Sequence, residues 1–222
     1  MNCAIISLLC SIMTKLGVWN RPYRSSFWML ALTACASPPE PAAPPPETTP
    51  RLVGKAPPAT GGYPSVIMLV PAVPIETPIP LEPALMDQYG TAFRPKLLVV
   101  RPGEPVDFKN SEDVLHNVHV IDAETRETEF NVGTPVVGAY RHVFEREGAY
   151  DVSCNIHPSM AAFVIVTAAP FVAVADSQGN FALEAIPEGT YDVRVWNLDF
   201  KRRSERKVTI DATTKSLTLT DS

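Results

Sequence analysis

The heptapeptide Cys154-Asn155-Ile156-His157-Pro158-Ser159-Met160 brings a thiolate, an imidazole and a thioether into one short loop. Earlier in the chain, Leu115-His116-Asn117-Val118 supplies a second imidazole. Two imidazoles and one thiolate, with a weak axial thioether, form the ligand set of a mononuclear copper site for electron transfer. Zinc is disfavoured, because zinc sites usually contain more thiolates or carboxylates and a thioether is a poor zinc ligand. The sequence therefore predicts a copper site formed by His116, Cys154, His157 and Met160.

The use of cysteine supports this interpretation. The chain contains four cysteines, at Cys3, Cys10, Cys35 and Cys154. The first two lie in a segment that we expect to be removed, and Cys35 has another expected role. In an oxidising compartment, the remaining thiol should be hidden, reactive or bound to metal. Alone, Cys154 would be interpreted as a small buried hydrophobic residue, but its spacing to His157 and Met160 favours copper. A binuclear copper centre is disfavoured, because it needs two bridging cysteines.

Residues 1–34 are interpreted as an export signal. They carry three positive charges and no negative one, since the first acidic residue is Glu40, and they include the apolar run 27–32. Their removal changes the formal charge of the chain from −5 to −8, because Lys15, Arg21 and Arg24 are lost. An acidic mature protein is not expected to bind nucleic acid through its phosphates. A cationic surface on a redox partner protein is the more plausible complement.

Cys35 is expected to carry lipid. The tetrapeptide Leu32-Thr33-Ala34-Cys35 resembles a bacterial lipobox, in which the cysteine becomes the first residue of the mature protein. An ordinary signal peptide cleaved near Ala36 is the alternative. Ala36 in place of Asp favours the outer membrane of a Gram-negative cell, so we expect a periplasmic, lipid-anchored protein. Residues 38–58 contain nine prolines and are expected to form an extended tether within a linker that spans residues 35–61.

From Tyr63 onward the sequence consists of short β-type runs without helical periodicity, which favours a sandwich of two sheets. In the run 114–120, His116 alternates in phase with Val118 and Val120, so it is expected to point inward with them. His119 has the opposite parity and is expected to face outward. His142 is interpreted as a surface strand residue.

A second group of short runs follows Ala169-Pro170 and predicts a small, hairpin-linked β unit. The segment 176–180 is interpreted as a hairpin turn, since it lacks the acidic alternation and the terminal Glu of a calcium loop. Lys201-Arg202-Arg203, together with Arg206 and Lys207, forms a basic cluster. It is interpreted as a solvated loop, with contact to an acidic partner or to lipid headgroups as the alternative.

Residues 62–168 resemble the plastocyanin–amicyanin group of cupredoxins. The resemblance is carried by Phe93-Arg-Pro95, Val106–Asn110, His116-Asn-Val118, Gly148-Ala-Tyr150 and Cys154–Met160. Met86-Asp87-Gln88, taken with the cysteine loop, is similar to exported proteins of the methylamine-utilisation type. Residues 169–222 resemble a carboxypeptidase regulatory-like domain of transthyretin-like fold, through Gly179-Asn-Phe181 and Gly189-Thr-Tyr191. This unit is short for that family, so a strand is either missing or borrowed from the first domain.

The resemblance implies an all-β protein, with a Greek-key sandwich at 62–168 and a second small sandwich at 169–222. His116, Cys154 and His157 would form the trigonal ligand set, Met160 would be axial, and Asn117 would tie the two ligand-bearing loops together. Such a protein is an electron carrier and not an enzyme, and no zinc peptidase motif is present in the second unit. Two alternatives stay open: a copper-binding or delivery protein of the cell envelope, and a structural β module without a redox role.

Overall fold

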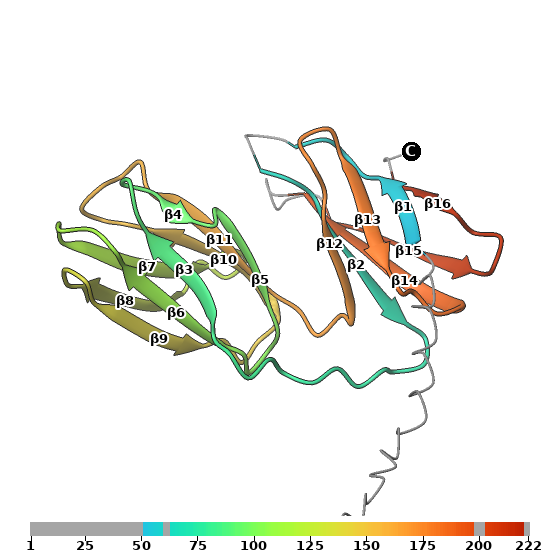
Figure 1. The fold of residues 1–222 in the computed structure, drawn as a ribbon, viewed down its shortest axis with the longest axis horizontal. Coiled ribbons are helices and arrows are strands. Elements are labelled where there is room, and N and C mark those ends of the chain that lie inside the picture. Colours follow the sequence, from blue (N-terminus) through green and yellow to red (C-terminus); the bar gives the residue numbers. More distant parts are fainter. Residues whose placement is uncertain (1–50, 60–62, 198–202, 220–222) are drawn as a thin grey trace, which may run out of the picture. The chain divides into compact units, whose positions relative to one another are not determined.

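The computed structural model describes residues 51–59, 63–197 and 203–219. Every regular element in these ranges is a β-strand, labelled β1 to β16 (Figure 1). Within them there is no helix long and apolar enough to cross a membrane. The predicted export signal, the lipobox with Cys35, most of the proline-rich linker and the basic residues Lys201 and Arg202 lie outside the described residues.

The first sandwich contains nine strands in two sheets. One sheet has the order β5-β11-β10-β7-β8 and the other has the order β4-β3-β6-β9 (Figure 1). The strands are β3 Ala84–Gln88, β4 Phe93–Arg94, β5 Leu97–Val100, β6 Pro105–Asn110, β7 His116–Asp122, β8 Thr128–Thr134, β9 Ala139–Val143, β10 Gly148–Ser153 and β11 Ala161–Val166. The predicted all-β sandwich is therefore confirmed.

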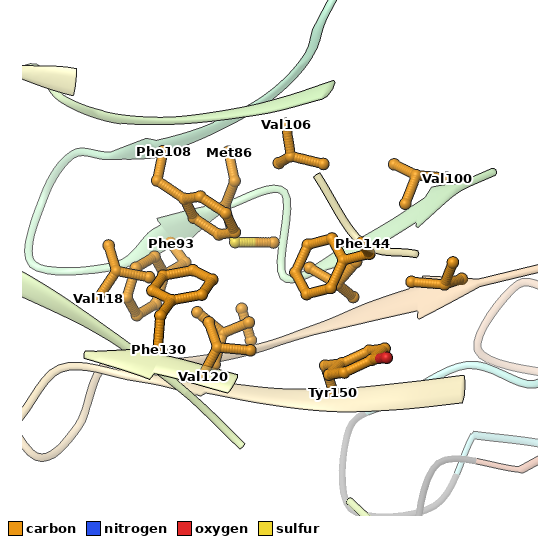
Figure 2. Packing of buried hydrophobic residues seen from close by; sticks show 14 of the residues in the cluster. Met86, Phe93, Val100, Val106, Phe108, Val118, Val120, Phe130, Phe144 and Tyr150 are labelled. Carbon is orange, nitrogen blue, oxygen red and sulfur yellow. The ribbon is translucent and has the colours of Figure 1, made fainter. Parts of the chain in front are cut away.

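Aromatic and aliphatic side chains fill the space between these two sheets (Figure 2). Phe108 meets Phe130 edge to face with the ring centroids 5.5 Å apart, and Phe144 lies 4.7 Å from Tyr150 by the same measure. Met86 and Val120 are fully buried beside them. These side chains alternate with outward-facing ones along each strand, as a sandwich requires, and this core holds the strands that carry the candidate ligands.

The second sandwich contains seven strands, in a four-stranded sheet β12-β2-β14-β15 and a three-stranded sheet β13-β1-β16. Its strands are β1 Arg51–Lys55, β2 Val66–Pro71, β12 Phe171–Val174, β13 Asn180–Glu184, β14 Gly189–Trp196, β15 Arg203–Ile210 and β16 Ser216–Thr218. Residues 176–180 form a turn in which Asp176 Oδ1 accepts hydrogen bonds from the backbone N–H groups of Gln178 and Asn180, both at 2.8 Å. The predicted hairpin is wrong, because the strands on either side, β12 and β13, belong to different sheets and the turn carries the chain from one sheet to the other. In the basic cluster, Lys207 lies 3.3 Å from Asp192 and Arg206 donates to the carbonyl of Thr218.

The boundaries of the two units differ from the prediction of 62–168 and 169–222. Strand β1 lies in the predicted linker and β2 in the predicted first domain, yet both belong to the second sandwich. β1 is the central strand between β13 and β16, and β2 pairs with β12 and β14. The second unit therefore borrows two strands, and the first sandwich is inserted between the neighbouring strands β2 and β12.

Strand β2 was misplaced because an apolar run does not reveal which sheet it joins. Ile67 and Leu69 face the core of the second sandwich, whereas Val66 and Met68 pack in a separate buried cluster with Ile165 of β11. The strand is thus buried on both faces and lacks the alternation that would have indicated one sheet.

The two sandwiches share a short sequence motif with the same local structure, which the sequence analysis did not identify. Each contains the hexapeptide Glu-Gly-x-Tyr-Asp-Val, at 147–152 and at 188–193. In the first, the Tyr150 hydroxyl donates to the carbonyl of Arg146 at 3.0 Å; in the second, Tyr191 donates to that of Pro187 at 2.6 Å. Both rings are buried. This arrangement is a tyrosine corner, which fixes the chain where it enters a strand.

Gly54→Ala should destabilise the second sandwich. A methyl group at this position of β1 would overlap the ring of Phe181 and lie 2.5 Å from the carbonyl oxygen of Leu217. Because β1 is paired on both sides, the backbone cannot easily move away. We expect the free energy of unfolding in urea to fall by about 1–3 kcal/mol. Gly133→Ala is the matched control, since nothing lies within 4 Å of the added methyl group there. Equal unfolding free energies of the two variants would contradict this account.

Candidate metal centre

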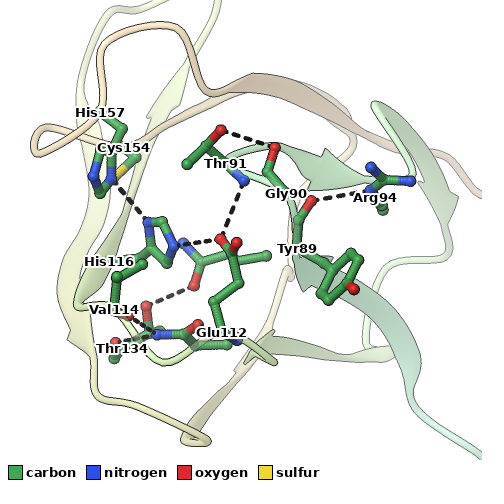
Figure 3. Close-up of polar contacts among 12 residues, drawn as sticks. Tyr89, Gly90, Thr91, Arg94, Glu112, Val114, His116, Thr134, Cys154 and His157 are labelled. Carbon is green, nitrogen blue, oxygen red and sulfur yellow. Dashed lines mark hydrogen bonds and ion pairs between the residues drawn. The ribbon is translucent and has the colours of Figure 1, made fainter.

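Three potential metal donors meet at one end of the first sandwich. His116 begins β7, Cys154 follows β10 directly, and His157 lies three residues further along the same loop. The Sγ atom of Cys154 is 3.9 Å from Nδ1 of His116 and 3.9 Å from Nδ1 of His157, and the two Nδ1 atoms are 3.0 Å apart (Figure 3). Among the described residues, this is the only compact group of at least three His, Cys, Asp or Glu side chains that could hold a metal ion.

The spacing of these atoms fits one metal ion. A triangle with sides of 3.0, 3.9 and 3.9 Å has a circumscribed radius of about 2.1 Å, which matches typical metal–nitrogen distances of about 2.0 Å and metal–sulfur distances of about 2.3 Å. Two imidazoles and a thiolate suit copper or zinc and do not suit magnesium or calcium. The donor set thus fits the predicted metal in both size and chemistry.

The strand parity of β7 is as predicted. His116 is fully buried together with Val118 and Val120, so it points into the sandwich. His119 lies on the other face, where its ring contacts Oδ1 of Asn155 at 3.2 Å and Oγ1 of Thr128 at 3.4 Å.

His142 is not part of the donor group, and its Nε2 lies 3.3 Å from Oε1 of Glu129. Its predicted surface position is wrong. The side chain is only 17% exposed and its ring packs against those of Phe130 and Phe144, with centroids 4.4 and 4.7 Å away. Sequence parity alone could not show that aromatic neighbours cover it.

The loop from Cys154 to Met160 closes on itself. The N–H of Met160 donates to the carbonyl of His157 at 2.9 Å, and the N–H of Cys154 donates to the carbonyl of Met160 at 3.3 Å. Met160 is buried and belongs to the same apolar cluster as Cys154, whereas His157 is partly exposed. The loop therefore turns a thiol and a thioether inward and leaves one imidazole near the surface.

Asn117 joins β7 to this loop, as the resemblance implied. Its Oδ1 accepts a hydrogen bond from the N–H of Asn155 at 2.7 Å, and its Nδ2 donates to Oδ1 of Asn131 at 2.8 Å. Asn117, which follows His116, is thus hydrogen-bonded to Asn155, which follows Cys154. This contact fixes His116 and Cys154 relative to each other, which is the role of the partners that surround a metal site.

Glu112 is a partner of the site that the sequence analysis missed. Its Oε2 lies 2.8 Å from Nε2 of His116 and accepts the N–H of Thr91 at 3.1 Å (Figure 3). These hydrogen bonds, that of Thr91 above all, hold the pKa of Glu112 below its ordinary value. Nδ1 of His116 faces the donor group, so with a metal on Nδ1 the Nε2–H group would donate a hydrogen bond to this carboxylate. The only sequence signal was a Glu four residues before a His, outside any helix, which is too common to be informative.

Several exposed apolar side chains lie close to the candidate ligands in the sequence or in the strand pairing. Leu115 is 56% and Ile156 is 45% exposed, and they flank His116 and His157 in the sequence. Val136 and Val137, both exposed, lie in the loop that follows β8, whose last residue pairs with His116.

Comparison with known proteins agrees with this geometry. Residues 84–167 match the family of copper binding proteins described as the plastocyanin/azurin family. Residues 84–167 begin with β3 and end just after β11, so the match coincides with the first sandwich. No curated protein matches the sequence. The first sandwich therefore matches the cupredoxin family model, and copper is the metal on which this match and the donor set agree.

Several solved structures are similar to part of the chain. Amicyanin from Paracoccus versutus is 24% identical, over 45% of this chain and 91% of that one, with a TM-score of 0.36. The purple cupredoxin from Nitrosopumilus maritimus is 27% identical, over 38% and 99% of the two chains, with a TM-score of 0.34. The copper-containing nitrite reductase from Thermus scotoductus SA-01 is 27% identical, over 44% and 25%, with a TM-score of 0.36.

The geometry divides the four histidines of the chain into two candidate metal ligands and two residues outside the donor group. His116→Ala and His157→Ala each remove one corner of the donor triangle, so Cu(II) affinity should fall by more than the roughly 100-fold that loss of an outer partner can cost. His119→Ala and His142→Ala should leave the affinity close to that of the wild type. Calorimetric titration of the four metal-free variants with Cu(II) measures this. A strong loss in His119→Ala but not in His116→Ala would show that the assigned strand register is wrong.

Proposed function

We propose that this chain is a mononuclear blue-copper electron-transfer protein of the bacterial periplasm. The observation that carries the proposal is the compact triangle of two Nδ1 atoms and one thiol sulfur, with separations of 3.0, 3.9 and 3.9 Å. In this proposal His116, Cys154 and His157 would hold the copper ion, and the thioether of Met160 would be a weaker fourth ligand. Bound copper supplies a centre that alternates between two oxidation states, and the protein supplies a fixed environment for it.

The residues around the site limit how far the ligands can move. His116 is held between the sheets and by Glu112, and Cys154 is held through the contact between Asn155 and Asn117. A ligand set that keeps its positions suits electron transfer, because a change of charge then requires little rearrangement. The process needs neither a substrate pocket nor a general base. We therefore assign the protein as a carrier and not as an enzyme.

His157 is the proposed exit for the electron. It is the only one of the four proposed ligands that is not buried, and Ile156 and Leu115 provide apolar surface next to it. A redox partner that matches this surface could bring its own centre close to the imidazole. Copper delivery, the alternative function, would use the same ligands but would require ready release of the ion. The burial of His116, Cys154 and Met160 favours the carrier.

The second sandwich is proposed to be a transthyretin-like domain of the carboxypeptidase regulatory-like type. Its two sheets of four and three strands support this, and β1 and β2 supply strands that the C-terminal segment lacks by itself. We assign it no catalytic role.

The colour of the copper-loaded protein tests the proposed function. The chain from residue 36 to the end, which retains β1 and β2, should bind one Cu(II) and show an intense blue thiolate-to-copper absorption. Cys154→Ser should abolish this band, because an alcohol oxygen cannot provide the covalent sulfur bond. Cyclic voltammetry should show a reversible one-electron couple. A wild-type protein that binds copper but has only weak d–d absorption would refute the assignment.

The axial ligand can be tested separately. Met160→Gln replaces a soft thioether by a harder oxygen donor, which favours Cu(II) over Cu(I). The reduction potential measured by voltammetry should therefore fall, while copper stays bound. Met160→Leu, which removes the donor without adding a harder one, should change the potential in the opposite direction. If neither substitution moves the potential, Met160 contributes only packing.

The proposed location rests on the sequence of residues 1–58. Cleavage before Cys35 and its lipidation would anchor the chain in the outer membrane, and the proline-rich segment would separate the folded part from the anchor. Several acyl chains on one cysteine make release from the membrane slow, since a single chain gives only marginal binding. The protein would then meet its redox partner in the periplasm while remaining attached.

Cys35→Ser should block lipidation and release the protein from the outer-membrane fraction. Fractionation of cells that express the wild type and the variant, with mass spectrometry of the mature N-terminus, measures both effects. A soluble wild-type protein without N-terminal lipid would rule out the anchor and leave the copper site unaffected.

A further inference from the structure

Gln88 is a fully buried polar residue in the core of the first sandwich. It ends β3, where its side chain points inward like that of Met86 two residues earlier. Met86 lies among apolar residues, as most of the core does, but Gln88 places a primary amide in this environment. A buried amide is costly unless both its oxygen and its nitrogen find partners. The positions of those partners therefore indicate what the residue does.

Both ends of the amide reach across to the opposite sheet. Nε2 of Gln88 donates to the carbonyl oxygen of Asn117 at 3.1 Å, and Oε1 accepts from the hydroxyl of Thr134 at 2.6 Å. Asn117 lies in β7 and Thr134 in β8, whereas Gln88 lies in the sheet of β3 and β6. Gln88 is thus a polar link between the two sheets.

Both hydrogen-bond partners of the Gln88 side chain, Asn117 and Thr134, are neighbours of the proposed ligand His116. Asn117 directly follows His116 in β7, and Thr134 is the residue opposite His116 in the pairing of β7 with β8. In addition, the carbonyl of Gln88 accepts the N–H of Ser111, in the loop that leads to His116. The position of His116 along and across the sheet is therefore set in part by an amide in the other sheet.

The link continues to the thiolate ligand. Asn117, whose carbonyl is held by Gln88, accepts the N–H of Asn155 on its side-chain oxygen at 2.7 Å. Asn155 is the residue after Cys154. Two hydrogen bonds through Asn117 thus connect β3 to the loop that carries the second ligand. A buried hydrogen-bonded network of this kind is rigid, because a member that moves leaves its partner without a hydrogen bond.

We propose that Gln88 is a positioning residue of the metal site, which fixes His116 and Cys154 relative to each other through Asn117 and Thr134. The proposal rests on the proposed copper function for its metal, but the hydrogen bonds of the network join protein atoms only. An apolar residue of similar length, such as methionine, would fill the same volume. The amide of Gln88 at this position is therefore better explained by the positioning of His116 and Cys154 than by packing of the core.

Gln88→Met in the chain from residue 36 onward tests the proposal with two measurements. In the metal-free protein, amide hydrogen exchange at Asn155 should become about 10-fold faster or more, because its acceptor is no longer held. In the loaded protein, Cu(II) affinity should fall about 10- to 100-fold, as for other outer partners of metal ligands. Thr167→Val is the matched control. It removes a buried hydroxyl that contacts Glu147 at the opposite end of the same sandwich, and neither quantity should change.

A second pair of variants covers the case in which Gln88→Met does not fold. Thr134→Val removes the donor to Oε1 and should reproduce both effects in weaker form, whereas Thr134→Ser keeps the hydroxyl and should restore wild-type behaviour. If exchange at Asn155 and Cu(II) affinity stay at wild-type values in Gln88→Met or in Thr134→Val, the positioning role is wrong. If the wild type binds no copper but exchange at Asn155 responds as expected, the copper function fails and the positioning role stands.

Discussion

The short separation between Nδ1 of His116 and Nδ1 of His157, 3.0 Å, is the constraint on which the candidate site depends. Two lone-pair donors at this distance, with a sulfur atom at 3.9 Å from each, do not stay together without support. The support comes from elements that are distant in sequence. β7 and β10 pair in one sheet, so their ends place His116 and Cys154 side by side. Glu112 and Asn117 then fix the rotation of one ring and the path of the loop.

The sequence predicted those features of the site that depend on strand alternation or on residues close together in the chain. Alternation along β7 was enough to orient His116 inward and His119 outward, because a one-residue change of register exchanges the faces. The cysteine loop was recognisable because three donors lie within seven residues. Glu112 and Gln88 were not identified as partners, since each acts through a contact between segments that only the folded chain brings together. The burial of His142 was missed for the same reason, because Phe130 and Phe144 come from other strands.

The domain boundaries show another limit of sequence patterns. An apolar run such as Val66–Pro71 indicates a strand, but not the sheet to which that strand belongs. Here the run pairs with β12 and β14, which lie a whole domain later in the chain. The insertion is geometrically simple, because β2 and β12 are neighbours and the inserted sandwich leaves and re-enters at adjacent positions. Insertion at such sites is generally tolerated, since the host sheet need not change.

The central place of β1 in its sheet has a consequence for the order of folding. β1 emerges early during synthesis, but both of its neighbours, β13 and β16, belong to the last part of the chain. Contacts with such long sequence separation form slowly, because the intervening loop must first close. The inserted copper domain has all its strands before that point and can complete its own core first. A truncated chain that lacks β13 and β16 therefore leaves both edges of β1 unpaired. Such an incomplete chain is prone to aggregation and to proteolysis.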